Sequence, residues 1–318
     1  MAAFADLNVP FLEDPRETEK LVSKAVKLGF ETIAICKIHR LKHETEKGKK
    51  NKKKDSGQLS PIDWNVLPAI QDLKKKNPKL NFYSRITVLL DDQSQVHQLS
   101  SEVVQAFDIL AVQPSTEKLY QQACKSLEID IISLEMSRRL PFYLKFPTVH
   151  AAVERGVHFE IIYSTAFKGT NERTQLLAIA MDMVVFTKGK NIIVSSGAEH
   201  ELDLRGPYDI VNLGLLFNFK EEQSKAAITK NCRAVLFHAQ ARKGTERSVI
   251  SGRCLLPHVN EQAKDIMEAT CSGGKPSKDD VNGNGKNEDD DYEPKDKRAK
   301  VEWLFVRDFC FTIIVSVP

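Results

Sequence analysis

Residues 107–134, FDILAVQPSTEKLYQQACKSLEIDIISL, contain the structural unit that the chain repeats. An apolar run at 107–112 predicts a β-strand, Ser115 caps a helix, and a second apolar run at 129–134 predicts the next strand. Both runs are continuously apolar rather than alternating. Such runs are typical of parallel strands that are covered on both faces, so the unit predicts an α/β fold with a parallel sheet.

The same unit recurs over about 240 residues, and eight βα units at this length predict a (β/α)8 TIM-like barrel. Asp14-Pro15 begins one of the intervening helices and Gly29 ends it. Periodicity alone does not distinguish a closed barrel from an open doubly wound sheet, which stays an alternative. The other predicted strands lie at residues 3–7, 32–36, 83–90, 157–163, 191–195 and, as a candidate eighth strand, 233–238.

Composition divides the chain into three parts. Residues 1–250 are predicted to form the barrel, with a lysine-rich loop insertion at 37–60. Residues 251–300 are predicted to be a mostly disordered polar tail, which contains a basic patch typical of nuclear-import signals. Residues 301–318 form an atypical apolar end whose last run is too short to span a bilayer of about 30 Å.

Charge and cysteine usage exclude several classes of protein. The 318 residues include 46 Lys and Arg against 43 Asp and Glu, for a net charge of +3. Residues 272–300 and 301–318 each carry −1, so residues 1–271 carry +5, which suits an anionic partner. The six cysteines form no CxxC pair and no signal-peptide apolar region begins the chain. These features exclude a zinc site of paired cysteines and predict a reduced, intracellular protein.

Residues that could support metal-dependent hydrolysis are sparse. Asp6, Asp92, His200 and Asp203 follow predicted strands, where a barrel places its ligands, but none has paired metal-ligand spacing. Solvated loop acids and helix caps are the favoured interpretation. Ser195-Ser196-Gly197 follows a strand without the Gly-x-Ser-x-Gly pattern of a nucleophile elbow. The residues therefore predict no catalytic group and no metal site.

Basic residues, in contrast, recur directly after the predicted strands, where they would share the carboxyl-terminal end of a barrel and could follow a phosphate backbone. A generally solvated surface is the alternative. Arg85 differs because it lies inside an apolar strand, so it must be paired or point into the barrel mouth. The predicted RNA-binding residues are Lys37, Arg40, Arg85, Lys118, Arg138, Arg139, Lys145, Lys168, Arg173 and Arg205.

The stretch RGPYDIVNLGLLF at 205–217 predicts a helix that begins at Pro207. Apolar residues at i+4 spacing follow, and they can pack on the barrel or on a partner. The predicted partner-binding residues are Tyr208, Val211, Leu215 and Phe219.

This stretch carries a resemblance, together with four others: FDILAVQPSTEKLYQQAC at 107–124, LPFYLKFPTVHAAVERGVHFEIIYS at 140–164, NIIVSSGAE at 191–199 and NCRAVLFHA at 231–239. The sequence resembles the roughly thirty-kilodalton protein subunit of eukaryotic ribonuclease P and ribonuclease MRP. The resemblance covers residues 1–250. It implies a barrel related to the polymerase-and-histidinol-phosphatase metal hydrolases but without their chemistry, and Asp6-Leu7-Asn8 stands where those enzymes carry metal-binding histidines.

The resemblance also implies a function. The family's complex removes the 5′ leader of precursor tRNA, the MRP particle processes ribosomal RNA precursors, and the RNA subunit carries the active site and its magnesium ions. The protein is then a non-catalytic, nuclear and nucleolar RNA-binding subunit that binds no cofactor itself. Its implied partners are the ribonuclease P and MRP RNAs, precursor tRNA indirectly, a small RRM-like subunit and the other subunits of the complex, with no membrane partner. A metal-dependent phosphoesterase of the same barrel superfamily is the alternative function.

Overall fold

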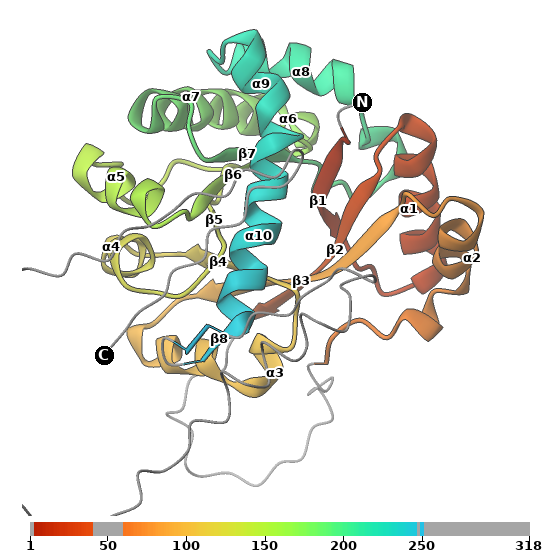
Figure 1. The fold of residues 1–318 in the computed structure, drawn as a ribbon. Helices are drawn as coiled ribbons and strands as arrows, with labels where there is room; N and C mark the ends of the chain where they lie inside the picture. Colours follow the sequence, from red (N-terminus) through yellow and green to blue (C-terminus); the bar gives the residue numbers. More distant parts are fainter. Residues whose placement is uncertain (1–2, 41–59, 247–248, 251–318) are drawn as a thin grey trace, which may run out of the picture. The chain divides into compact units, whose positions relative to one another are not determined.

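Seven strands form one parallel sheet in which each strand pairs with the next along the chain. The computed structural model describes residues 3–40, 60–246 and 249–250 (Figure 1). All of the described residues belong to one compact unit, Met1–Arg253. The strands are β1 (Ala5–Pro10), β2 (Thr32–Arg40), β3 (Asn81–Leu90), β4 (Ile109–Pro114), β5 (Ile131–Ser133), β6 (His158–Ile162) and β7 (Ile192–Ser195).

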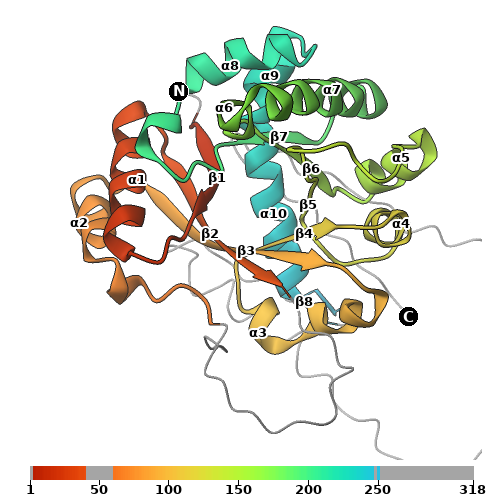
Figure 2. The same ribbon diagram turned by 180° about the vertical axis from the view of Figure 1, so that it is seen from behind.

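Helices connect these strands and surround the sheet (Figures 1 and 2). Short 3₁₀ turns lie at Trp64–Val66, Gln93–Ser100 and Glu201–Asp203, and a hairpin of Thr245–Glu246 (β8) and Val249–Ile250 (β9) ends the described chain. No helix in the described ranges is both long and apolar enough to cross a membrane. The helices are α1 (Pro15–Leu28), α2 (Pro68–Lys76), α3 (Glu102–Gln105), α4 (Glu117–Lys125), α5 (Phe146–Glu154), α6 (Thr165–Lys168), α7 (Thr170–Thr187), α8 (Pro207–Leu216), α9 (Glu221–Ala227) and α10 (Lys230–Gly244).

Helix α1 illustrates how local sequence sets the boundaries. The Asp14 side chain accepts a hydrogen bond from the Arg16 backbone N–H at 2.9 Å, and Pro15 occupies the first turn. Gly29 ends the helix at φ 104°, a left-handed conformation that favours glycine. Leu21 and Ala25 lie on the buried face, so the predicted start, stop and core face of this helix are confirmed.

The sheet curves until its two edge strands meet. The Gly197 backbone N–H, just after β7, donates to the Asn8 carbonyl of β1 at 2.8 Å. The Ser196 backbone N–H also donates to the Asp6 carboxylate at 3.1 Å. The fold is therefore a nearly closed barrel rather than an open sheet, as predicted.

The barrel has seven strands, and the predicted eighth strand at 233–238 is wrong. Those residues belong to α10, whose buried residues Cys232, Val235 and Ala239 have helical spacing. Cys232 and Val235 pack with Ala5 and Ile131 from the amino-terminal ends of the strands. α10 crosses in front of the strands in Figure 1 and behind them in Figure 2, so it covers this end of the barrel.

Two predictions concern residues that the structure does not describe. The lysine-rich part of the loop at 41–59 lies outside the described residues, and so do the tail and apolar end at 251–318. Both stay predictions.

Candidate nucleic-acid interface

The barrel interior contains a buried ion pair. Arg85 of β3 donates two hydrogen bonds of 2.6 Å to the two carboxylate oxygens of Glu160 on β6, and both side chains are 0% exposed. The Arg85 guanidinium also donates to the Leu7 carbonyl at 2.8 Å. Glu160 accepts further hydrogen bonds from Asn8 Nδ2 and Ser195 Oγ. The pair thus joins strands from opposite sides of the barrel.

The ion pair with Glu160 rules out the RNA contact that was predicted for Arg85. Burial alone would raise the pKa of the Glu160 carboxyl, but the charge and hydrogen bonds of Arg85 outweigh burial and hold that pKa below its ordinary value. Glu160 is therefore ionised and Arg85 is fully paired. The prediction that Arg85 binds RNA is wrong, because no part of its side chain reaches the surface.

Asp6 lies in the same interior but forms no metal-binding group. Its Oδ1 accepts from the Asn8 and Ser196 backbone N–H groups, whereas the buried Oδ2 has no hydrogen-bond partner among the described residues. Burial raises the pKa of the Asp6 carboxyl. The described residues contain no group of three or more His, Cys, Asp or Glu that could hold a metal ion. Asp6, Asp92, His200 and Asp203 thus do not form such a group among the described residues.

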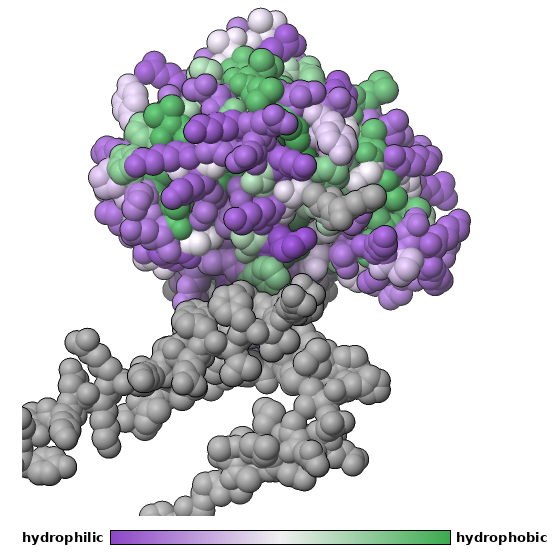
Figure 3. Space-filling model, turned by 45° about the horizontal axis from the view of Figure 1, so that its top comes forward, coloured by the Kyte–Doolittle hydropathy of each residue, from purple (hydrophilic) through white to green (hydrophobic). Residues whose placement is uncertain are grey.

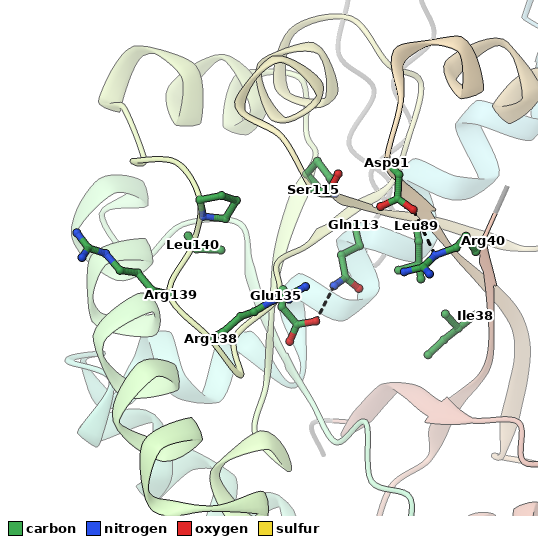
Figure 4. A pocket seen from close by; sticks show the side chains of 12 residues that line it. Ile38, Arg40, Leu89, Asp91, Gln113, Ser115, Glu135, Arg138, Arg139 and Leu140 are labelled. Carbon is green, nitrogen blue, oxygen red and sulfur yellow. Dashed lines mark hydrogen bonds and ion pairs between the residues drawn. The ribbon is translucent and has the colours of Figure 1, made fainter. Parts of the chain in front are cut away.

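A pocket of about 560 Å³ opens at the carboxyl ends of β2 to β5 (Figure 4). One side is formed by residues that end β2, and the other by the loop between β5 and α5. The lining combines apolar and polar groups, as ligand sites commonly do. The lining residues are Ile38, Arg40, Leu89, Asp91, Gln113, Pro114, Ser115, Glu135, Arg138, Arg139, Leu140 and Pro141.

The polar groups of the pocket are partly engaged with one another. Arg40 forms an ion pair with Asp91, with 3.2 Å between Nε and Oδ2. Gln113 Nε2 donates to Glu135 Oε2 at 3.2 Å. Figure 4 shows Arg138 turned towards Glu135, and Arg139 pointing away from the cavity. Arg40 and Arg138 thus each face a carboxylate, and Arg139, beside the pocket, donates to the Tyr143 hydroxyl at 3.1 Å.

The carboxylate of Glu135 is held in its charged form. Burial would raise its pKa, but hydrogen bonds from Ser137 and the charge of Arg138 lower it below the ordinary value. Gln113 and Glu135 were not predicted from the sequence, because the predicted RNA-binding residues are all basic. Their position directly after predicted strands was the available signal.

The remaining predicted RNA-binding residues lie on the same end of the barrel but outside the pocket. Lys145 pairs with Glu117 at 2.7 Å and Lys168 with Glu199 at 3.1 Å. The Arg205 guanidinium lies 4.4 Å from the centre of the Phe167 ring. The others are Lys37, which donates to the Ser60 carbonyl, Arg173, which donates to the Ala166 carbonyl, and the exposed Lys118. The structure brings Arg40, Arg138 and Arg139 together and distributes the rest around the rim.

The predicted partner-binding stripe is divided by burial. Tyr208 is 69% and Leu215 49% exposed, whereas Val211 is 8% and Phe219 5% exposed. Val211 and Phe219 belong to the hydrophobic core, so placing them on a partner surface was wrong. Val211 lies on the buried face of α8 with Ile210 and Gly214. Phe219 follows the end of α8 at Leu216, where Asn218 adopts φ 71° and the chain turns back towards the core. Leu216, 63% exposed, was missed.

Fold and pocket together define a seven-stranded α/β-barrel protein with an arginine-rich pocket at the carboxyl ends of its strands. The chain belongs to the family described as RNase P subunit p30, whose model matches residues 3–244.

Several known proteins are similar to this chain, and their names include ribonuclease P. The chain is 38% identical to the mouse ribonuclease P protein subunit p30 over 245 residues, which cover 76% of this chain and 88% of the mouse protein. It is 37% identical to the probable ribonuclease P protein subunit 3 of Schizosaccharomyces pombe, over 62% of this chain and 82% of the yeast protein. A chain in a cryo-EM structure of archaeal ribonuclease P with mature tRNA shares the fold. The TM-score is 0.58 at 14% identity, and the match covers 79% of this chain and 98% of that one.

Proposed function

We propose that this chain is a protein subunit of ribonuclease P that binds RNA with the carboxyl-terminal end of its barrel. The family and the names of its relatives support the assembly. The observation that carries the RNA contact is the grouping of Arg40, Arg138 and Arg139 around one pocket. Guanidinium groups bind phosphate oxygens in a bidentate manner and stack on unpaired bases, which is how proteins recognise single-stranded RNA.

Catalysis belongs to the RNA in this proposal. The chain's task is to support an RNA that removes the 5′ leader of precursor tRNA with its own magnesium ions, and the chain holds no cofactor. The interior polar groups agree with this division, because the buried carboxylate of Glu160 is fully paired with Arg85. Nuclear and nucleolar location, and a parallel role in ribonuclease MRP and ribosomal RNA processing, belong to the same proposal.

The proposed protein partner is the small RRM-like subunit, bound to the outer face of α8. Tyr208, Leu215 and Leu216 are exposed there and supply apolar area. Figure 3, in which the top of Figure 1 is turned forward, shows apolar groups gathered in its upper part, towards which α8 and α9 are turned.

The RNA contact is tested with charge reversal in the full chain. Each lost phosphate contact lowers the slope of log affinity against log salt by about one. The variant R138E/R139E should therefore bind the ribonuclease P RNA more weakly, with a slope lower by about two. The matched control is K220E/K225E, which reverses two exposed cations at α9. Equal affinities and slopes for wild type and R138E/R139E would exclude this end of the barrel from the RNA interface.

A further inference from the structure

Helix α1 presents a row of cations on its outer face. Arg16, Lys20, Lys24 and Lys27 follow one another at intervals of four, four and three residues. This spacing places them along one side of a helix, opposite the buried Leu21, Val22 and Ala25. With a rise of about 1.5 Å per residue, the row is about 16 Å long.

A groove of about 350 Å³ runs beside this row, and all four cations line it together with Glu19, Ser23, Ala69 and Glu201. Glu19 is engaged, because its carboxylate accepts a hydrogen bond of 2.8 Å from the Ala69 backbone N–H. None of the four cations forms an ion pair with a residue that the structure describes. Their charges are therefore available to a ligand, in contrast to Lys145 and Lys168, which are paired.

α1 and α2 carry a net positive charge, whereas α7, α8 and α9 carry a net negative one. α1 and α2 together contain seven basic and three acidic residues, since α2 ends in Lys74, Lys75 and Lys76. α7, α8 and α9 contain two basic and five acidic residues. On a surface that is merely solvated, basic and acidic residues would be interspersed on every helix. Figure 3 shows that the margin on the side of α1 and α2 is mainly hydrophilic.

The row begins at the carboxyl-terminal end of the barrel. α1 follows β1 directly and returns along the outside of the sheet, so Arg16 lies nearest that end and Lys27 furthest from it (Figures 1 and 2). A chain that binds at the carboxyl-terminal end can thus continue over the edge of the barrel and along α1.

We propose that the α1 groove is a second RNA site, which binds the phosphate backbone. The proposal rests on the proposed function, since it extends the RNA interface from the end of the barrel to its flank. Three of the four cations are lysines, which act as point charges on flexible stems. The groove also offers no aromatic side chain on which a base could stack. Binding there is accordingly independent of sequence and sensitive to salt.

The test compares four full-length proteins: wild type, R16Q/K20Q/K27Q, R138E/R139E and the control K220E/K225E. The three α1 positions are exposed, and glutamine is a good helix former, so the fold should be kept. Thermal unfolding verifies this. The α1 variant should bind the ribonuclease P RNA on the order of tenfold more weakly at fixed salt, with a slope lower by about three. Base changes in the RNA should not alter that loss.

The outcomes separate the two proposals. If the α1 variant binds like wild type while R138E/R139E is weakened, the α1 site is wrong and the proposed function stands. If neither variant is weakened, the proposed function fails as well. If the α1 variant keeps its RNA affinity but loses a protein subunit on co-purification, the flank is a protein interface and the RNA proposal for α1 is overturned. Cross-linking of Lys20 or Lys24 to bound RNA, identified by mass spectrometry, would support it directly.

Discussion

Arg85 and Glu160 face each other across the inside of the barrel, with both guanidinium-to-carboxylate hydrogen bonds at 2.6 Å and no exposed surface on either side chain. The two residues come from β3 and β6, which are not neighbours in the sheet. Their contact therefore fixes strands that the backbone ladder does not join directly. It also places a fully buried charge pair in the barrel interior.

Replacing one member of this pair should destabilise the protein strongly. In E160Q the Arg85 guanidinium becomes a buried charge without a counter-ion, and in R85M the same happens to Glu160. Each change should cost about 3–5 kcal/mol of unfolding free energy. Urea denaturation followed by circular dichroism measures this loss. The double variant R85M/E160Q completes the cycle and should be less destabilised than the sum of the singles, because no unpaired charge is left. Purely additive losses would contradict the pairing.

A second buried carboxylate, Asp130, should make stability depend on acid pH. Asp130 precedes β5 and accepts hydrogen bonds from His238 at 2.8 Å and from Arg242 at 3.0 Å, both on α10. Burial would raise the pKa of Asp130, but His238 and Arg242 outweigh it and lower the pKa below its ordinary value of 3.8. The resulting stabilisation is present above the unfolded-state pKa and is lost as pH falls through the folded-state pKa.

The variant D130N should therefore be less stable at pH 7, by about 3 kcal/mol or more, because Arg242 is left without its buried partner. Its unfolding free energy should also fall less steeply than that of wild type between about pH 5 and pH 2. Denaturation curves across this range measure both effects. A wild-type slope in D130N would show that other carboxylates cause the acid dependence.

Gly214 should tolerate no side chain. A Cβ at this position of α8 would overlap Ser224 Oγ of α9 and lie 2.9 Å from Ser224 Cβ. Alanine is the better helix former by about 1 kcal/mol, but overpacking costs about 1–3 kcal/mol, so G214A should be destabilised on balance. The double variant G214A/S224A should recover part of the loss, since the overlapping hydroxyl is gone. Equal unfolding midpoints for G214A and wild type would show that α8 and α9 can separate freely.

The sequence predicted those parts of the fold that local patterns determine. Continuous apolar runs located seven strands, and Asp14, Pro15 and Gly29 located a helix to within a residue. The run at 233–238 was misassigned because a short apolar segment fits both a strand and a buried helix. Only the spacing of Cys232, Val235 and Ala239 separates the two.

The candidate site was less predictable because it depends on distant contacts. Arg85 was expected to be paired or to reach the barrel mouth, but its partner Glu160 lies 75 residues away, and nothing local links them. Similarly, Arg40 and Arg138 meet at one pocket only because β2 and β5 end at the same side of the barrel. The position of these residues directly after predicted strands placed them at the carboxyl-terminal end of the barrel. It did not predict which of them would line one pocket.

The proposed partner surface of α8 is tested at its exposed leucines, because Phe219 is buried. Aspartate at Phe219 would unfold the core, whereas L215D/L216D changes only exposed side chains. Both leucines are exposed, so this variant should keep the wild-type unfolding curve. It should weaken binding of the small RRM-like subunit on the order of tenfold or more, because buried apolar anchors contribute most of the affinity of an interface. Co-purification of the two tagged subunits measures the loss. The matched control is M181D/V185D on α7, whose side chains are 41% and 61% exposed. If the control is as defective as L215D/L216D, or if neither variant is, the partner does not bind specifically to α8.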